Sequence, residues 1–338
     1  MLLPLPREAA ILARTVGEME RARGWIESTS GLCVESISPI PGGAGRRRYF
    51  RVALEEASLI LMHAIPEDPA ILPPALRVTG NEIPFVEVTE YLARNGLPVP
   101  KLWGVEPNER WVLLEDFGDT HLLDLPPDDR SLRLHEAIDW LARVHALPRS
   151  DALPFRRAFD AEWVRFELRT FAEHGLPERF HRVLAPELDS LAAAVAALPR
   201  VLCLRDYQSQ NLMVDPAGRL RILDYQDALL APPELDLAAL THDSYVEIPE
   251  PDRAALVTRY WTARRVSPDP AAFSLLVVQR KCKDYGRYRL LVEQKGDLRY
   301  RPYIARAAAS VRGALPALPP AQRRLAEILR DALPESAK

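Results

Sequence analysis

The hydrophobic positions in the first third of the chain follow two different periods. Apolar residues three or four positions apart predict a helix over 8–23, ended by Gly24, and another over 84–95. Five β-type segments accompany them, over 33–39, 48–54, 58–64, 101–105 and 111–114. This part of the chain is therefore expected to form a mainly antiparallel sheet that carries one internal helix.

After Gly118 the pattern becomes mainly helical. The predicted helices cover 130–146, 160–174, 187–198, 233–246, 252–265, 270–294 and 321–332. Short strands are expected over 201–204, 212–214 and 220–223. A small β-rich lobe over 1–117 followed by a larger helical lobe over 118–338 is an α+β arrangement, and the cleft between two such lobes is expected to hold a ligand.

Composition narrows the class of partner. The 338 residues carry a formal net charge of −3, which gives no general reason to expect nucleic acid or a membrane surface as a partner, so a small molecule is expected. The longest apolar runs are too short to cross a bilayer. Cys33, Cys203 and Cys282 form no C-x-x-C pair, so neither a zinc site nor a disulfide framework is predicted. Unpaired thiols fit a reducing compartment, and a cytoplasmic protein is expected.

The strongest chemical signal is an R-D-x-x-x-x-N segment that contains Asp206 and Asn211. Asp224 follows thirteen residues after Asn211, across two short predicted strands. Phosphoryl transfer needs a carboxylate to orient the attacking hydroxyl and oxygen ligands for Mg²⁺ on the ATP phosphates. A hairpin between the two predicted strands would bring Asp224 back beside the loop, and the three residues would then supply these groups.

A second interpretation of the same residues is purely structural. Asp206 and Asn211 are common turn-formers, and a short motif of this kind also occurs by chance. Asp224 at the end of a credible hairpin favours the catalytic interpretation.

At this point the sequence resembles a known family. It is similar to the aminoglycoside phosphotransferase superfamily of kinase-like enzymes. Within that superfamily it most resembles bacterial anomeric kinases that phosphorylate N-acetylmuramate and N-acetylglucosamine in cell-wall recycling. The resemblance covers nearly the whole chain and is carried by residues 47–52, 84–87, 96–100, 113–119, 206–213, 224–228 and 279–283.

The resemblance implies a protein-kinase-like two-lobed fold, with ATP and Mg²⁺ as cofactors. Asp206 would be the catalytic residue, and Asn211 and Asp224 would bind the metal. The segment from 41 to 48 would cover the nucleotide phosphates, and residues 114–117 would form the hinge that binds adenine through backbone groups. The implied nucleotide contacts are Gly42, Gly43, Gly45, Arg47, Arg48, Glu115 and Phe117. From chemistry alone, the glycine-rich turn is more often a plain hairpin connection.

Three residues are candidates for contact with the acceptor. Asp227 lies close to Asp224 in sequence, where a structural role is an equally good interpretation. Arg280 and Lys283 lie on one face of a predicted helix within a basic stretch, most of which is expected to coat solvated helix faces. A basic face suits an acceptor that carries a carboxylate or phosphate, as N-acetylmuramate does through its lactyl group.

The chain departs from the family pattern at several positions. Leu204 stands where many relatives have a positioning His, and Met62 stands near where many have the Lys that grips the phosphates. The turn reads Gly43-Ala44-Gly45, where sugar-kinase relatives favour Asp-Ala-Ser.

Without that Lys, one of Arg46, Arg47 and Arg48, which follow the glycine-rich turn, is a candidate for the counter-charge. For any single one of them, a solvated charge on an exposed strand is an equally good interpretation. Because neighbours in a strand point to opposite faces, at least one of Arg47 and Arg48 should face the cleft. Glu87, which would pair with the Lys in protein kinases, is expected to pair with an Arg of the loop instead.

Three functions remain open from sequence. The first is a kinase for the anomeric hydroxyl of an amino sugar. The second is a kinase for another small alcohol, including an aminoglycoside or a choline-like cation. The third is a pseudokinase, suggested by Leu204 and Met62. Retention of Asp206, Asn211 and Asp224 argues against the third, and the basic helix argues against a cationic acceptor.

Overall fold

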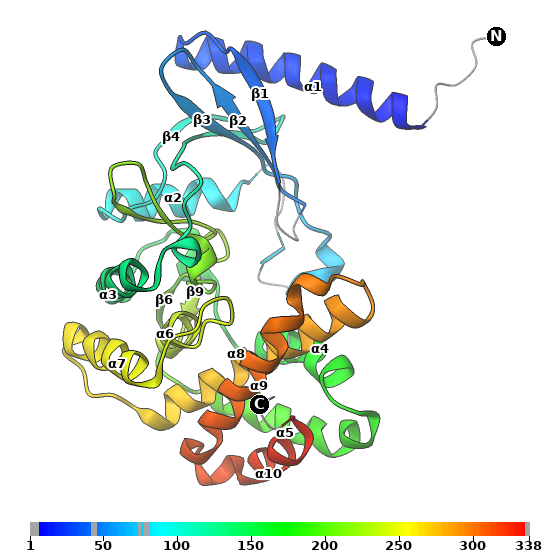
Figure 1. Cartoon of the computed structure of the whole chain (residues 1–338), viewed down its shortest axis with the longest axis vertical. Coiled ribbons are helices and arrows are strands. Elements are labelled where there is room, and N and C mark those ends of the chain that lie inside the picture. The colour runs from blue at the N-terminus through cyan, green and yellow to red at the C-terminus, as the bar shows by residue number, and fades with distance from the viewer. Residues whose placement is uncertain (1–6, 42–45, 74–75, 78–81, 335–338) are drawn as a thin grey trace.

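The computed structural model describes residues 7–41, 46–73, 76–77 and 82–334. Its N-terminal part is built on an antiparallel sheet with strand order β1-β2-β3-β5-β4. Figure 1 shows this sheet at one end of the molecule, with the helical remainder below it. The strands are β1 (Ser36–Ile40), β2 (Arg48–Ala53), β3 (Ser58–His63), β4 (Leu102–Glu106) and β5 (Trp111–Glu115). All five strands predicted from the sequence are present.

One face of the sheet is covered by α1 (Arg7–Ser30). The prediction that Gly24 ends this helix was wrong, because the helix continues to Ser30 and stops before Gly31, whose φ is 70°. Ala22 and Ile26 are fully buried against apolar side chains of the sheet, and this burial offsets the low helix propensity of glycine. The residues of β2 that face α1 include Phe50 and Val52.

The opposite face of the sheet packs on α2 (Pro84–Arg94). Met62 lies on this face, is fully buried, and belongs to one apolar cluster with Val88 and Leu92 of α2. An apolar side chain therefore fills the position near which a phosphate-gripping Lys would stand.

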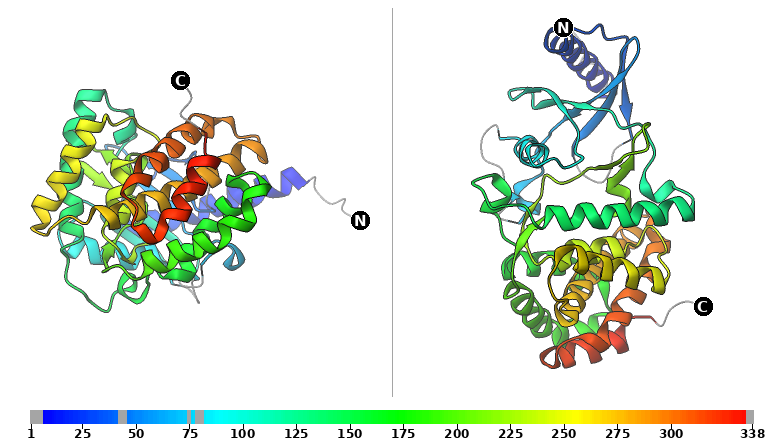
Figure 2. Two further views of the ribbon diagram at one scale, coloured as in Figure 1. Left: turned by 90° about the horizontal axis from the view of Figure 1, so that it is seen from below. Right: turned by 90° about the vertical axis from the view of Figure 1, so that its left-hand side faces the viewer.

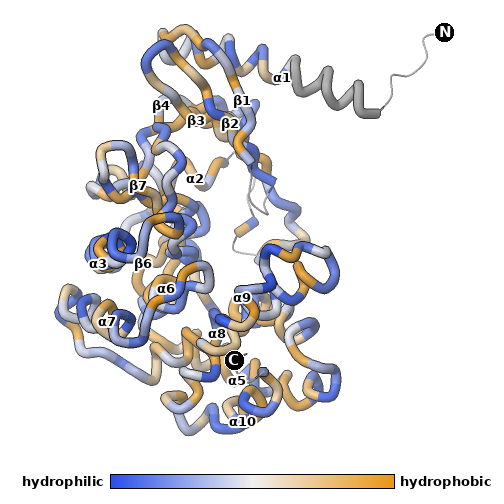
Figure 3. Tube along the Cα trace, viewed as in Figure 1, coloured by the Kyte–Doolittle hydropathy of each residue, from blue (hydrophilic) through white to orange (hydrophobic). Residues whose placement is uncertain are grey.

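The C-terminal part is a set of packed helices (Figures 1 and 2). They are α3 (Pro127–Val144), α4 (Ala161–Thr170), α5 (His181–Ala196), α6 (Glu234–Thr241), α7 (Glu250–Arg264), α8 (Pro270–Glu293), α9 (Arg301–Ala314) and α10 (Arg323–Ala332). In Figure 3 the trace changes between hydrophilic and hydrophobic colours within single helices, as expected of amphipathic helices around shared cores. The predicted α+β arrangement of a β-rich part followed by a helical part is confirmed.

Two helices of this part differ from the sequence-based expectation. The helix α5 begins at His181, before Pro186, whereas the prediction began after this proline. Proline removes one backbone donor from the helix, but Leu184, Leu188 and Leu191 of α5 are buried and hold the segment in place. The helix α9 was not predicted; its fully or nearly buried residues, Ala307, Ala308 and Val311, include two alanines that give little hydrophobic signal.

Two small antiparallel pairs of strands lie at the junction of the two parts. β7 (Leu212–Val214) pairs with β8 (Leu220–Ile222). β6 (Val201–Cys203) pairs with β9 (Leu229–Ala231), a strand that the sequence analysis missed. Both pairs border the loop that carries the R-D-x-x-x-x-N segment. No helix in the described ranges is long and apolar enough to span a membrane.

Candidate active site

The three residues of the predicted catalytic signal lie together. The Asn211 side-chain amide donates a hydrogen bond to the backbone carbonyl of Asp206 at 2.8 Å, and it lies 3.4 Å from the Asp224 carboxylate. The β7–β8 hairpin returns the chain to this point, as the Leu223 N–H shows by bonding to the Asn211 carbonyl at 2.9 Å. One base, one amide and one carboxylate are therefore grouped on two adjoining loops.

The backbone just before Asp206 is held by Asp236 of α6. The Asp236 carboxylate is fully buried and accepts the N–H groups of Leu204 at 2.6 Å and Arg205 at 2.8 Å. Arg205 has a φ of 75°, a left-handed conformation that a residue with a side chain adopts only when its surroundings impose it. Asp236 thus braces the turn that leads into Asp206. Atoms of Asp236, His145 and Cys203 lie within 4.8 Å of one another, but hydrogen bonds already occupy both Asp236 oxygens.

The Asp206 carboxylate is surrounded by cations. Arg280 of α8 donates to Asp206 Oδ1 at 2.8 Å, Arg205 Nη1 lies 3.8 Å from Oδ2, and Lys283 Nζ lies 3.9 Å from Oδ1. Burial by itself would favour the protonated acid, but the charges of Lys283, Arg280 and Arg205 outweigh it and hold the pKa of Asp206 well below its ordinary value. The group is therefore ionised and can accept a hydrogen bond from a hydroxyl.

The position of Arg280 corrects the expectation of a solvated or acceptor-binding side chain. Its side chain is only 2% exposed and its charge is already paired with Asp206. Lys281 is also buried and bonds to Asp284 at 2.8 Å. Lys283 is 13% exposed and its ion-pair distances are longer, so of the two basic candidates for acceptor contact it is the less tightly paired.

Glu167 of α4 is a member of this charge cluster that sequence analysis missed. It accepts from Arg205 at 3.0 Å and from Gln279 at 2.9 Å, and lies 3.5 Å from Lys283. Burial alone would raise its pKa, yet Lys283 and the neighbouring arginines lower it to about 2. One glutamate on a charged helix carries no sequence signal for this role, because its partners are far away in the chain.

Asp227 completes the cluster by accepting a hydrogen bond from Arg205 Nη1 at 2.9 Å. The cluster thus contains three cations, Arg205, Arg280 and Lys283, and three anions, Asp206, Glu167 and Asp227. It is electrically balanced and does not form an acidic wall that would attract a polycation.

Arg47 and Arg48 point to opposite sides, as strand alternation predicts. Arg47 Nη2 donates to Asp224 Oδ1 at 3.0 Å, and Arg47 Nη1 is buried without a hydrogen-bond partner among the described residues. Arg48 instead contacts Glu18 of α1 and His63 on the outer face of the sheet. Of Arg47 and Arg48, Arg47 is therefore the one that lies beside Asp224 and on the cleft side of the sheet.

The expected pairing of Glu87 with an Arg of the loop was wrong. Glu87 accepts from Arg156 at 2.8 Å and from the backbone N–H of Leu153 at 2.6 Å. With an apolar Met62 beneath the sheet, this carboxylate finds its partners in the segment that follows α3.

The two hinge candidates, Glu115 and Phe117, differ in whether the backbone N–H is already hydrogen-bonded. The Glu115 N–H is bonded to the Lys101 carbonyl at 2.9 Å, whereas the Phe117 N–H has no partner in the described part of the chain. Arg51 of β2 fastens this segment by bonding to Asp116 at 2.7 Å and to Asp119 at 2.7 Å. Strand alternation places Arg51 on the cleft side, so a signal for it was present in the sequence.

Gly42, Gly43 and Gly45 lie outside the described residues, so the predicted contact of this turn with phosphates stays a prediction.

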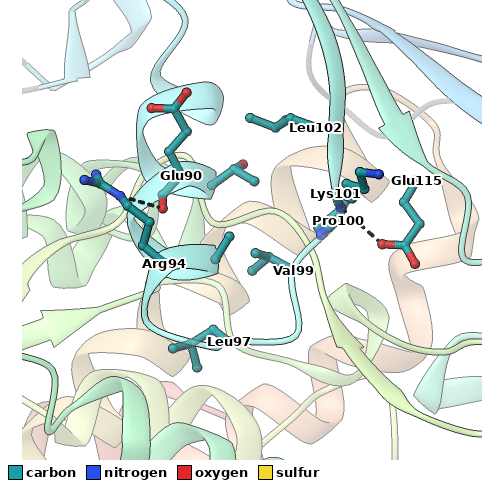
Figure 4. A pocket seen from close by; sticks show the side chains of 10 residues that line it. Glu90, Arg94, Leu97, Val99, Pro100, Lys101, Leu102 and Glu115 are labelled. Atoms are coloured by element: carbon teal, nitrogen blue, oxygen red, sulfur yellow. Dashed lines mark hydrogen bonds between the residues drawn. The ribbon is translucent and has the colours of Figure 1, made fainter. Parts of the chain in front are cut away.

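An open hollow of about 600 Å³ lies between α2 and the segment that leads into β4 (Figure 4). Leu97, Val99 and Leu102 form part of its wall, and Glu90 and Lys101 stand at its sides. Asp206, Asn211 and Asp224 are not among the residues that line it. This hollow is therefore separate from the site that these three residues form.

The side-chain oxygens of Asp224 and Asn211 fit a hard divalent cation. Asp224 supplies a carboxylate, and Asn211 retains its amide oxygen because its hydrogen bonds are made by the nitrogen. Mg²⁺ prefers oxygen ligands of this kind, from one or two protein side chains together with phosphate and water.

Comparison with known proteins places this geometry in a family. Residues 36–276 match the phosphotransferase enzyme family, APH. The chain belongs to this family. It is also 30% identical over 301 residues to the N-acetylmuramate/N-acetylglucosamine kinase of Pseudomonas aeruginosa, with 84% of this chain and 83% of that protein covered. The protein of the same name from Caulobacter vibrioides is 29% identical over 333 residues, covering 86% and 90%.

Solved structures show the same fold at low sequence identity. The choline kinase LicA of Streptococcus pneumoniae superposes with a TM-score of 0.65 at 16% identity, covering 87% of this phosphotransferase and 99% of that chain. A spectinomycin phosphotransferase in complex with ADP and spectinomycin gives a TM-score of 0.59 at 13% identity, covering 92% and 97%. The predicted kinase-like two-lobed fold is confirmed, and the enzyme class expected from sequence is that of the family.

Proposed function

We propose that this phosphotransferase transfers the γ-phosphoryl group of ATP to the anomeric hydroxyl of an N-acetylated amino sugar, N-acetylmuramate or N-acetylglucosamine, giving the sugar 1-phosphate. The observation that carries the reaction type is the grouping of Asp206 and Asp224 around Asn211, whose side-chain amide bonds to the Asp206 carbonyl and to the Asp224 carboxylate. The acceptor is supported by curated relatives named for these two sugars. A cytoplasmic location, where ATP is available, is part of the proposal.

Each residue then has a distinct task. Asp206, ionised and held by cations, orients the acceptor hydroxyl and takes up its proton. Asn211 and Asp224 would hold Mg²⁺, which, when bound, neutralises charge on the phosphates. The backbone N–H of Phe117 is available to an adenine edge, and the boundary between the lobes would fall at this hinge, after residue 117.

The alternatives raised by the sequence receive less support. A pseudokinase has no chemical need for a complete Asp206, Asn211 and Asp224 set. A cationic acceptor, such as the one named for the choline kinase of similar fold, would be better served by an excess of carboxylates than by the balanced cluster around Asp206.

Arg47 is proposed to replace the missing Lys as the counter-charge for the phosphates. Truncation of Arg47 to alanine should raise the apparent KM for ATP by about 10–100-fold, since a charged contact of about 1.5–3 kcal/mol is lost. Met62→Lys should not raise activity, because Met62 is fully buried in the apolar cluster with α2. Steady-state kinetics with varied ATP measures both effects.

Arg48→Ala is the matched control for this prediction, because Arg48 lies on the α1 side of the sheet. It should leave the KM for ATP nearly unchanged. If the Arg47→Ala variant and the wild type have equal KM values for ATP, the counter-charge for the phosphates lies on another residue.

Lys283 is proposed to meet the lactyl carboxylate of N-acetylmuramate, because it is partly exposed beside Asp206 and loosely paired. Lys283→Met should lower kcat/KM for N-acetylmuramate at least about 30-fold more than for N-acetylglucosamine, which corresponds to a charge-pair loss of about 2 kcal/mol or more. The exposed Lys295→Met is the control and should leave the ratio of the two sugars unchanged. An equal loss for both sugars would remove Lys283 from acceptor recognition.

The direct test of the acceptor class is ATP consumption by the purified protein over a panel of sugars, aminoglycosides and small alcohols. The proposal expects N-acetylmuramate and N-acetylglucosamine to give the highest kcat/KM. Higher values for an aminoglycoside or for choline would overturn it.

A further inference from the structure

Arg280 binds three separate groups of the catalytic loop. Its Nη1 donates to the backbone carbonyl of Arg205 at 2.8 Å, and its Nη2 donates to Asp206 Oδ1 at 2.8 Å and to Gln208 Oε1 at 3.2 Å. The guanidinium is only 2% exposed and comes from α8, more than seventy residues further along the chain. A buried cation with three partners on one loop fixes the shape of that loop.

The loop needs such a partner because its backbone is strained. Arg205 has a φ of 75°, and the residue before it, Leu204, is a buried apolar side chain that can offer no hydrogen bond. Asp236 holds the N–H side of this turn through Leu204 and Arg205, and Arg280 holds its carbonyl side. The two residues together fix the turn from both sides.

We propose that Arg280 is the positioning residue of the reaction: it ties down Oδ1 of Asp206 and the adjoining carbonyl, leaving Oδ2 to receive the acceptor hydroxyl. This inference rests on the proposed role of Asp206 and adds a residue that acts through it, without touching the acceptor. The geometry also explains why Arg is used. Its planar fork can serve a carbonyl and a carboxylate at once, whereas the single ammonium of a lysine cannot hold the same pair in fixed directions.

Arg280→Gln should therefore lower kcat about 10²-fold, the cost of misplacing a reacting group by roughly 1 Å, and leave the KM for ATP within about twofold. Arg280→Lys keeps the charge but not the fork, and should recover part of the loss, to about tenfold below wild type. The matched control is Arg287→Gln, an exposed arginine two turns further along α8, which should leave kcat unchanged.

A double-mutant cycle separates positioning from general destabilisation. If Arg280 acts through Asp206, adding Arg280→Gln to Asp206→Asn should lower the residual rate by less than about threefold, although the same change costs about 10²-fold in the wild type. If the losses multiply, or if Arg280→Gln lowers kcat by less than threefold on its own, the inference is wrong. If thermal melting shows that Arg280→Gln does not fold, the same cycle is measured with Arg280→Lys. This change should lower kcat about tenfold in the wild type and should cause no further loss in the Asp206→Asn variant.

The cycle does not depend on the identity of the acceptor. It is measured with whichever acceptor the wild type phosphorylates, or with basal ATP hydrolysis, in which water takes the place of the hydroxyl. Failure to use an amino sugar would therefore overturn the proposed function alone, whereas multiplying losses would overturn the role of Arg280 alone.

Discussion

Asp206→Asn is expected to lower kcat by about 10²–10⁴-fold while ATP still binds. The carboxylate is the group that orients the acceptor and accepts its proton, and general-base assistance is typically worth this much. Asparagine has nearly the same shape, so nucleotide contacts should persist. Steady-state kinetics gives kcat, and calorimetry gives the affinity for ATP.

The fold of this variant needs its own check, because Asp206→Asn removes the anionic partner of buried Arg280. Asp284, 3.7 Å from Arg280, remains as a second anion, so the variant is expected to stay folded by thermal melting. Asp252→Asn, an exposed change at the start of α7, is the control and should retain full turnover. Near-normal turnover in Asp206→Asn would exclude this loop as the catalytic one.

Asp224→Asn is expected to weaken Mg²⁺-dependent ATP binding by about 10–100-fold or more, since a charged oxygen ligand is replaced by a neutral one. Binding measured without Mg²⁺ should not fall, because Arg47 is then released from its ion pair with Asp224 and can still meet the phosphates. Calorimetry with ATP at several Mg²⁺ concentrations separates the two conditions.

Asn211→Ala is the comparison for this variant and should cost less, because it removes a neutral ligand. The same Mg²⁺ dependence in wild type and Asp224→Asn would show that Asp224 is not a ligand.

The sheet and the catalytic loop could be predicted because their signals are local. The strands of the N-terminal part are β-type runs of five or six residues, and Asp206, Asn211 and Asp224 lie within nineteen positions of the sequence. Alternation also correctly placed Arg47 and Arg48 on opposite faces. The misplaced end of α1 and the missed α9 both reflect tertiary packing, which decides helix limits that glycine and alanine leave open.

The charge cluster could not be derived in the same way. Arg280 and Glu167 reach the catalytic loop from helices 74 and 38 residues away, and nothing in the spacing of either residue encodes that contact. From sequence, Arg280 was therefore interpreted as an acceptor contact, whereas its buried position gives it Asp206 as a partner. The basic residues of this helix indicated a positively charged surface. Only their packing shows that Arg280 and Lys281 are already paired with carboxylates.

The central claim is that phosphate is transferred to the anomeric carbon's hydroxyl. Phosphorus NMR of the product formed from ATP and N-acetylglucosamine tests it most directly, with the 1,5-anhydro analogue, which lacks that hydroxyl, as the matched control. We predict one phosphate resonance coupled to the proton on C1, and no product from the analogue. A phosphate on any other carbon, or equal turnover of the analogue, would contradict the account.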